Sequence, residues 1–122
     1  MSVSNAAIIK GIDIIAYTAQ NGERAKGFYR DVLGLPVTAD YGPQGAEFTL
    51  GDGTTFGVWQ IDDGSFTPAS GVMFAVDDIR AAVATLTTRG VTFTGDVDES
   101  PVCFMAFAKD TEGNSFIVHQ RK

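Results

Sequence analysis

The chain has 122 residues, 44% of them hydrophobic, and a formal net charge of −6 at pH 7. This length and apolar content suit one globular domain with a buried core, and they exclude a disordered chain. The negative charge, with no stripe of Lys or Arg, argues against binding to nucleic acid. We therefore expect a single domain over residues 1–122.

Three features bear on the location of the protein. The first ten residues lack the basic start and apolar core of a signal peptide, and no apolar run reaches the roughly 20 residues needed to span a bilayer. The single cysteine, Cys103, excludes an intramolecular disulfide. Because it lies between Val102 and Phe104, we interpret it as a packed apolar residue and not a nucleophile. These features indicate a cytoplasmic protein without a membrane anchor.

The first half of the chain predicts one strand, one helix and three further strands. Residues 8–19 are rich in Ile and read as a strand. Asn21 can cap a helix whose apolar residues recur at helical spacing and which ends at Gly34. Turn residues then separate strands over 36–41, 46–50 and 54–61. The first module is therefore βαβββ, over about residues 8–61.

The second half repeats this order after a polar connection over residues 62–70. A strand over 71–76 precedes a helix that begins at Asp77 or Asp78 and ends at Gly90. Strands over 91–94, 102–108 and 115–120 follow. The second module, about residues 71–120, is again βαβββ, so the fold class is α+β.

The last strands of the two modules share a sequence frame, because Gly53, Phe56, Val58 and Gln60 each recur 60 residues later. Side chains alternate between the faces of a strand, so Phe, Val and Gln share one face in both copies. We expect these matching residues to pack under the helices. The residues that differ, Gly57 against Ile117 and Trp59 against His119, should then face a concavity where a ligand could bind.

Three stretches resemble the glyoxalase/bleomycin-resistance/dioxygenase proteins, the vicinal oxygen chelate superfamily. They are residues 15–35, with Arg24-Ala25, Phe28-Tyr29 and Leu33-Gly34-Leu35; residues 74–91, with Val76-Asp77-Asp78-Ile79; and residues 104–114, with Lys109-Asp110-Thr111-Glu112-Gly113-Asn114. The resemblance covers essentially the whole chain. It implies that the two modules combine into a curved mixed sheet around a cleft, and that the protein is a homodimer.

The resemblance also implies where metal ligands would lie in the metal-dependent members of this superfamily. Those places fall on Ile14, Gly57, Gly71 and Ile117. None of these side chains offers a donor atom. A shift of one residue in the first strand would supply Asp13, which an exposed strand position explains equally well. We expect no metal and no other cofactor.

Seven residues are candidates for the ligand site. His119 and Glu47 could act as acid or base, because both should face the concavity. Five others could line the site: Trp59, Met73, Met105, Phe107 and Ile117. Each also has an ordinary structural interpretation, His119 as a strand-end histidine, Glu47 as a solvated strand residue and Trp59 as part of the core.

Two functions fit these observations. The first is a metal-free protein that binds a small, partly apolar or aromatic molecule, as the antibiotic-sequestering members of the superfamily do. The second is a glyoxalase-like lyase or isomerase that acts on a small oxygenated metabolite with His119 or Glu47. Fold alone does not choose between them, because one fold hosts many functions.

Overall fold

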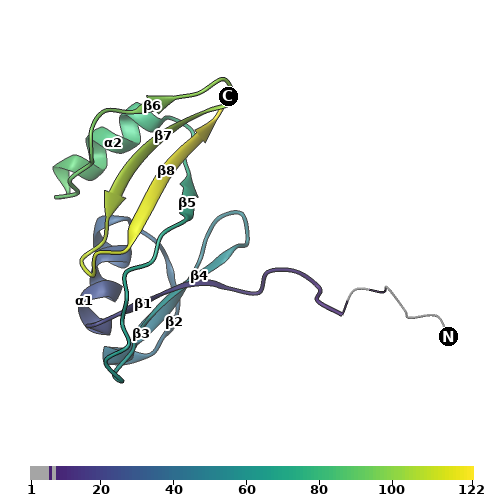
Figure 1. The fold of residues 1–122 in the computed structure, drawn as a ribbon, viewed down its shortest axis with the longest axis vertical. Coiled ribbons are helices and arrows are strands. Elements are labelled where there is room, and N and C mark those ends of the chain that lie inside the picture. The colour runs from purple at the N-terminus through teal and green to yellow at the C-terminus, as the bar shows by residue number, and fades with distance from the viewer. Residues whose placement is uncertain (1–5, 7) are drawn as a thin grey trace.

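The computed structural model describes residue 6 and residues 8–122, and it contains two four-stranded sheets joined end to end (Figure 1). Helical segments cover one face of each sheet and leave the other face bare. The elements in chain order are β1 Ile15–Ala19, α1 Gly22–Gly27, the π-helical turn η1 Phe28–Val32, β2 Val37–Asp40, the 3-10 turn η2 Gly42–Gln44, β3 Gly45–Thr49, β4 Thr55–Gln60, β5 Val72–Ala75, α2 Ile79–Thr88, β6 Asp98–Glu99, β7 Cys103–Lys109 and β8 Ser115–Arg121.

The two sheets have the same topology. Their strand orders are β1-β4-β3-β2 and β5-β8-β7-β6. In each, the first and last strands of the module are parallel neighbours, and the other pairs are antiparallel. The α+β fold with two βαβββ modules is thus confirmed. In both modules the last strand, β4 or β8, lies in the interior of its sheet.

The helices begin at the predicted caps and receive a second cap from the sheet. Asn21 accepts a hydrogen bond from the Arg24 backbone N–H, and Asp78, not Asp77, caps α2 in the same way. The repeated glutamines supply this second cap. Gln60 and Gln120 each accept a hydrogen bond of 2.9 Å from the first backbone N–H of the helix in their own module. None of the helices in the described residues is long and apolar enough to cross a membrane.

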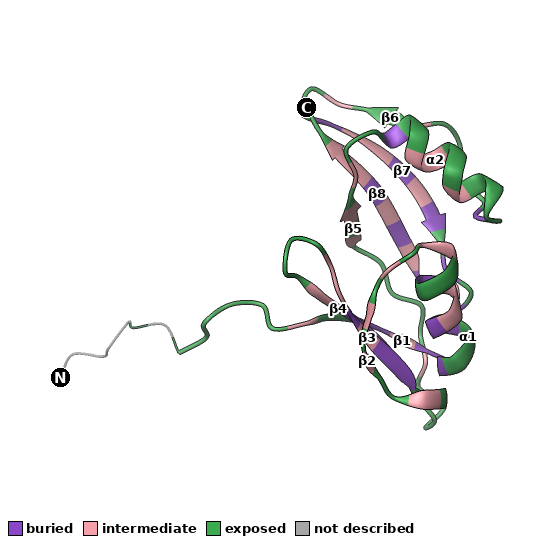
Figure 2. Ribbon diagram, turned by 180° about the vertical axis from the view of Figure 1, so that it is seen from behind, coloured by how far each residue is buried: buried purple, intermediate pink, exposed green. Residues whose placement is uncertain are grey.

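The core lies between the helices and the sheets and is continuous across both modules (Figure 2). Phe56 and Val58, and their counterparts Phe116 and Val118, are buried on the helix side, as expected. Phe74 joins the two halves, because its ring centroid lies 5.4 Å from that of Phe56 and 6.0 Å from that of Phe116. The modules therefore share one apolar interior.

The turn over residues 110–114 also fastens the second module to the first. The buried carboxylate of Glu112 accepts a hydrogen bond of 2.9 Å from the backbone N–H of Asn21. The hydroxyl of Tyr29 donates to Asp110 at 2.6 Å. The sequence predicts only a connecting turn here, yet its acidic residues are buried because donors from the first module satisfy them.

Two expected strands differ from those observed, and one observed strand was not expected. The first strand begins at Ile15, and residues 8–14 precede it without strand pairing, with bends at Ile8 and Gly11. Residues 91–94 form only a single bridge, between Phe93 and Ala108, because the chain turns at Gly95, where φ is 72°. The edge position next to β7 goes instead to the two-residue strand β6, which the sequence does not reveal.

Candidate functional site

The helix-free face of the first sheet carries Glu47 and Trp59. Glu47 of β3 lies opposite Gly57 of β4, and Gly57 lies opposite Ala16 of β1. Trp59 is two residues beyond Gly57 and so shares its face. Both side chains are half-buried. The structure thus brings two of the predicted site residues together on one surface.

The indole of Trp59 occupies the space that Gly57 leaves open. A Cβ atom built on Gly57 would lie 2.6 Å from Cζ3 of Trp59 and 2.9 Å from Cδ1 of Ile14. The ring therefore folds back over the strand, with Ile14 beside it. A side chain at residue 57 would collide with both. The absence of a side chain at Gly57 therefore allows the indole to lie over the strand on this face.

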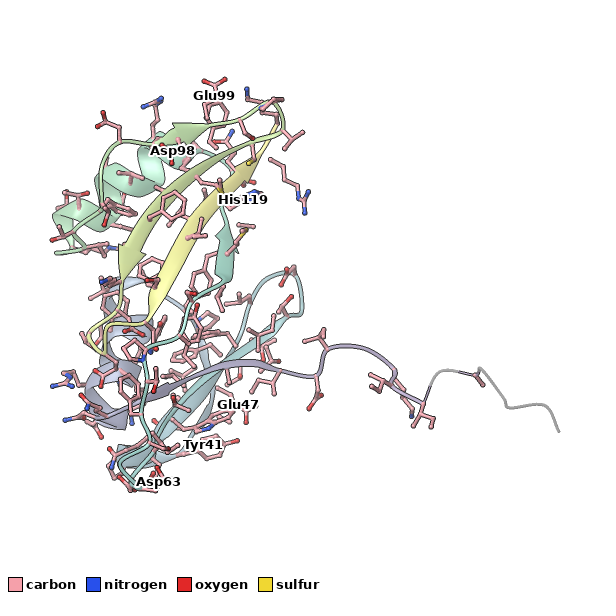
Figure 3. The ribbon with its side chains drawn as sticks, viewed as in Figure 1. Tyr41, Glu47, Asp63, Asp98, Glu99 and His119 are labelled. Carbon is pink, nitrogen blue, oxygen red and sulfur yellow. The ribbon has the colours of Figure 1, made fainter. Side chains whose placement is uncertain are left out.

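Tyr41 holds the Glu47 carboxylate. Its hydroxyl donates a hydrogen bond of 2.5 Å to Oε2 of Glu47, and this bond to a carboxylate raises the pKa of Tyr41. Figure 3 shows both residues at the same end of the first sheet. The sequence predictions missed Tyr41, since the pairing follows from the register of the β2–β3 hairpin, which contains an irregularity between Val37 and Ala39.

The helix-free face of the second sheet is mainly apolar. Met73, Ile117 and Phe107 form one row across β5, β8 and β7. His119 lies in the next row, between Ala75 and Met105. All five predicted site residues of this module therefore share one face, where Met73 is exposed and the others are half-buried.

The register shows how the two faces correspond. Gly57 and Ile117 each pair with the first and third strands of their module, and so do Trp59 and His119. Glu47, the partner of Gly57, therefore matches Phe107, the partner of Ile117. One half offers an indole and a carboxylate, while the equivalent places in the other half offer an imidazole and apolar side chains.

Within one chain these residues form two groups on separate sheets. Figure 3 shows His119 on the second sheet and Glu47 at the far end of the molecule on the first. An apolar cavity lies elsewhere, where the modules meet. This junction groove has a volume of about 580 Å³ and is lined by residues that include Ile15, Leu35, Leu50, Val72, Met73 and Leu86. Of the seven predicted site residues, only Met73 lines it.

The residues present do not fit a metal ion of the kind that the superfamily's metal-dependent members bind. Ile14 and Gly57 do converge on one place, but that place is filled by the Ile14 side chain and the Trp59 ring. No group of three or more His, Cys, Asp or Glu side chains that could hold a metal occurs in the part of the chain that the structure describes. The alternative ligand Asp13 is exposed, on the segment before β1.

The fold and its two helix-free faces define the chain as a protein of paired βαβββ modules. A sequence model of the Glyoxalase/Bleomycin resistance protein/Dioxygenase superfamily matches residues 11–118. The chain therefore belongs to this superfamily. No curated protein matches the chain.

Solved structures agree with this assignment. TnmS3, an antibiotic binding protein from Streptomyces sp. CB03234, is 24% identical with a TM-score of 0.80, covering 96% of this chain and all of that one. A superfamily member from Sphaerobacter thermophilus DSM 20745 is 26% identical with a TM-score of 0.77, covering 93% and 99%. Lactoylglutathione lyase from Agrobacterium tumefaciens is 21% identical with a TM-score of 0.71, covering 93% and 96%. Likeness at identities below 25% shows the shared fold and not a shared ligand.

Proposed function

We propose that this chain binds a small, partly apolar or aromatic molecule on its helix-free faces, without a metal ion. The observation that carries the proposal is the Trp59 indole, which Gly57 allows to fold back onto the sheet and form a flat aromatic surface. Aromatic surfaces bind planar ligands by stacking and cations by attraction to the ring face. A protein of the same fold, TnmS3, is described as antibiotic binding, which supports this class of function.

The other residues of the two faces suit the same kind of ligand. The row of Met73, Ile117 and Phe107 provides an adaptable apolar wall. Glu47, oriented by Tyr41, provides one fixed acceptor that would orient a donor or cationic group of the ligand. Few polar groups on a mainly apolar surface are typical of small-molecule sites.

We propose further that the protein is a homodimer. The two faces lie on separate sheets of one chain and are open, so a second copy would supply the opposite wall of a cleft. The ligand is a small molecule and not a nucleic acid, because the chain carries a net charge of −6. The one thiol, Cys103, is buried beside the Ser100 hydroxyl, which fits the cytoplasmic location that we propose.

Trp59 makes the proposal directly testable, since it is the only tryptophan of the chain. Titration with a panel of planar aromatic compounds should change its fluorescence, and calorimetry then gives the affinity of the best compound. We expect Trp59→Ala to weaken that affinity at least tenfold, which is about 1.4 kcal/mol. Val102→Ala, an equally simple truncation at an exposed residue outside both faces, is the control. Equal affinities for Trp59→Ala and wild type would rule out this site.

A second candidate function is a metal-free lyase or isomerase, favoured by His119 and the Tyr41–Glu47 pair. Either His119 or Glu47 could take a proton from a carbon next to a carbonyl group and return it to a neighbouring atom. His119→Ala or Glu47→Gln should then abolish turnover while the thermal unfolding midpoint stays near that of the wild type. Full activity of both variants on an identified substrate would eliminate this candidate.

A further inference from the structure

The strands of the first sheet carry carboxylates but no basic side chains. All four strands, β1 to β4, are described by the structure, and they contain no Lys, Arg or His. Their acids are Glu47 and Asp40. Asp40 is bound to the amine of Lys26, which is itself buried. The charge that the strands leave for a ligand is therefore that of Glu47.

The second sheet has the opposite character. Its strands contain Lys109, His119 and Arg121, and alternation along β7 and β8 places all three on the helix-free face, near the single acid Asp98. All the basic side chains in the strands of the described chain thus belong to the second module. The helix-free face of the first sheet should prefer a different kind of ligand group from that of the second.

Glu47 and Tyr41 together present hydrogen-bond acceptors. The Tyr41 hydroxyl donates to Oε2 of Glu47, and this bond raises the pKa of Tyr41, so the hydroxyl keeps its proton. Oε1 of Glu47 accepts no hydrogen bond within the described residues. Figure 3 shows the two residues near each other. A ligand group that donates hydrogen bonds can use Oε1, whereas an anion would be repelled.

The indole lies beside this carboxylate with its electron-rich ring. Cζ3 and Cε3 of Trp59, both in the six-membered ring, are 2.6 and 3.3 Å from the place of a Cβ atom on Gly57. Gly57 and Glu47 are register partners on neighbouring strands, which lie about 4.8 Å apart. A cation near Glu47 would therefore also be within reach of the ring face, which attracts positive charge.

We propose that the first sheet selects aromatic amines, with the aromatic ring stacked on Trp59 and the protonated amino group donating to Oε1 of Glu47. The inference rests on the small-molecule binding proposed above and names the class of ligand. One strand spacing separates the indole from the carboxylate, so the amino group should be one or two carbon atoms from the ring. Aromatic acids, and aromatic compounds with acceptors alone, should be poor ligands.

Three compounds that share one ring system test this selectivity: naphthylmethylamine, naphthylmethanol and naphthoate. Trp59 is the only tryptophan, so its indole N–H gives one site-specific signal in a nitrogen–proton correlation spectrum. Titration of that signal measures each dissociation constant. We expect the amine to bind about tenfold more tightly than the alcohol, because its hydrogen bond to Glu47 is charge-assisted. Naphthoate should bind more weakly than the alcohol.

Two variants separate charge from stacking. Glu47→Gln keeps the size of the side chain but removes its charge, so it should bring the amine to the affinity of the alcohol and leave the alcohol unchanged. Trp59→Ala should weaken both compounds. Asp77→Asn is the matched control, because Asp77 is an exposed acid without a hydrogen bond or ion pair in the described part of the chain. It should keep the preference for the amine.

The outcomes distinguish this proposal from the one on which it rests. If none of the three compounds shifts the Trp59 signal, small-molecule binding at this site fails, and the selectivity fails with it. If the compounds bind but the amine has no advantage, or keeps its advantage in Glu47→Gln, only the selectivity fails. Loss of the advantage in Asp77→Asn as well would attribute it to net charge and would also overturn the role of Glu47.

Discussion

Glu112 and Arg24 join the two modules through two hydrogen bonds, from Nε at 2.7 Å and from Nη2 at 3.0 Å. The carboxylate is buried, and it also accepts the backbone N–H groups of Gln20 and Asn21, where the first strand turns into the first helix. The Glu112 side chain thus accepts hydrogen bonds from three residues of the first module: Gln20 directly after β1, the helix cap Asn21, and the guanidinium of Arg24. Directional hydrogen bonds, as well as the shared apolar core, therefore join the two modules.

Loss of this carboxylate should destabilise the whole chain. Glu112→Ala leaves two backbone N–H groups and the Arg24 guanidinium without their acceptor, so we expect the free energy of unfolding to fall by about 2–4 kcal/mol. Urea unfolding measures this change. Asp31→Ala is the control, because it removes a carboxylate from the exposed pair with Arg30 and should leave the midpoint unchanged. Equal midpoints for the two variants would mean that Glu112 contributes nothing.

The same carboxylate predicts an acid limit to stability. Burial opposes its ionisation, but hydrogen bonds from Arg24, Thr111 and Asn21 outweigh burial and lower the pKa of Glu112 below its usual 4.5. A group whose pKa is lower in the folded state stabilises the fold above its unfolded pKa. That stability is lost as the pH falls below about 4.5 and through the folded pKa.

Urea midpoints between about pH 6 and pH 3 test this dependence. We expect Glu112→Gln to be less stable than the wild type at pH 6 and to lose less of its stability on acidification. Parallel pH profiles for the two proteins would show that other carboxylates cause the acid sensitivity.

Tyr29 supports a second buried carboxylate. Its hydroxyl donates to Asp110, and burial, with the nearby negative charge of Asp110, raises the pKa of Tyr29 far above its ordinary value. Tyr29→Phe removes one donor to a buried acid and should lower the free energy of unfolding by about 1–3 kcal/mol.

Tyr41→Phe makes the same chemical change at an exposed hydroxyl that donates to Glu47, so it is a matched control and should leave stability unchanged. Chemical denaturation compares the two variants. A loss in Tyr41→Phe as large as that in Tyr29→Phe would show that burial does not decide the cost.

Gly57 should be intolerant of any side chain. In Gly57→Ala the new methyl group would meet the Trp59 ring at 2.6 Å, so the ring must move and we expect a loss of about 1–3 kcal/mol. The emission spectrum of Trp59 should change at the same time. Gly51→Ala, where nothing lies within 4 Å of the added atom, should change neither. An unchanged emission spectrum in Gly57→Ala would contradict the placement of the indole.

Much of the fold could be predicted because the sequence repeats its own structural signals. The helical spacing of Ala25 and Tyr29 and the caps Asn21 and Asp78 identify both helices. The shared frame of the last strands separates the helix side from the bare side. Each of these signals depends on residues close together in the chain, so it can be recognised in a single sequence.

The features that escaped prediction depend on packing between distant segments. The segment over residues 8–14 has the composition of a strand, but whether it pairs with β4 depends on residues outside the segment. The Tyr41–Glu47 bond depends on a hairpin register with an irregularity. The junction groove is lined by residues of both modules, so it depends on how the modules pack against each other. The spacing of hydrophobic residues along the sequence does not encode that packing.

The glutamine caps imply an order of events during synthesis. Gln60 and Gln120 lie on the last strand of each module, and that strand is also the one that pairs with the module's first strand. The helix of each module receives its second cap, and the first strand gains its pairing partner, only after the glutamine of the last strand has been synthesised. As the chain leaves the ribosome, the first sheet and its helix caps can therefore form once residue 60 has emerged, while the N–H groups of Gln20 and Asn21 wait for Glu112. The second half must wait for residue 120, and until then its apolar helix face remains a target for aggregation or for chaperones.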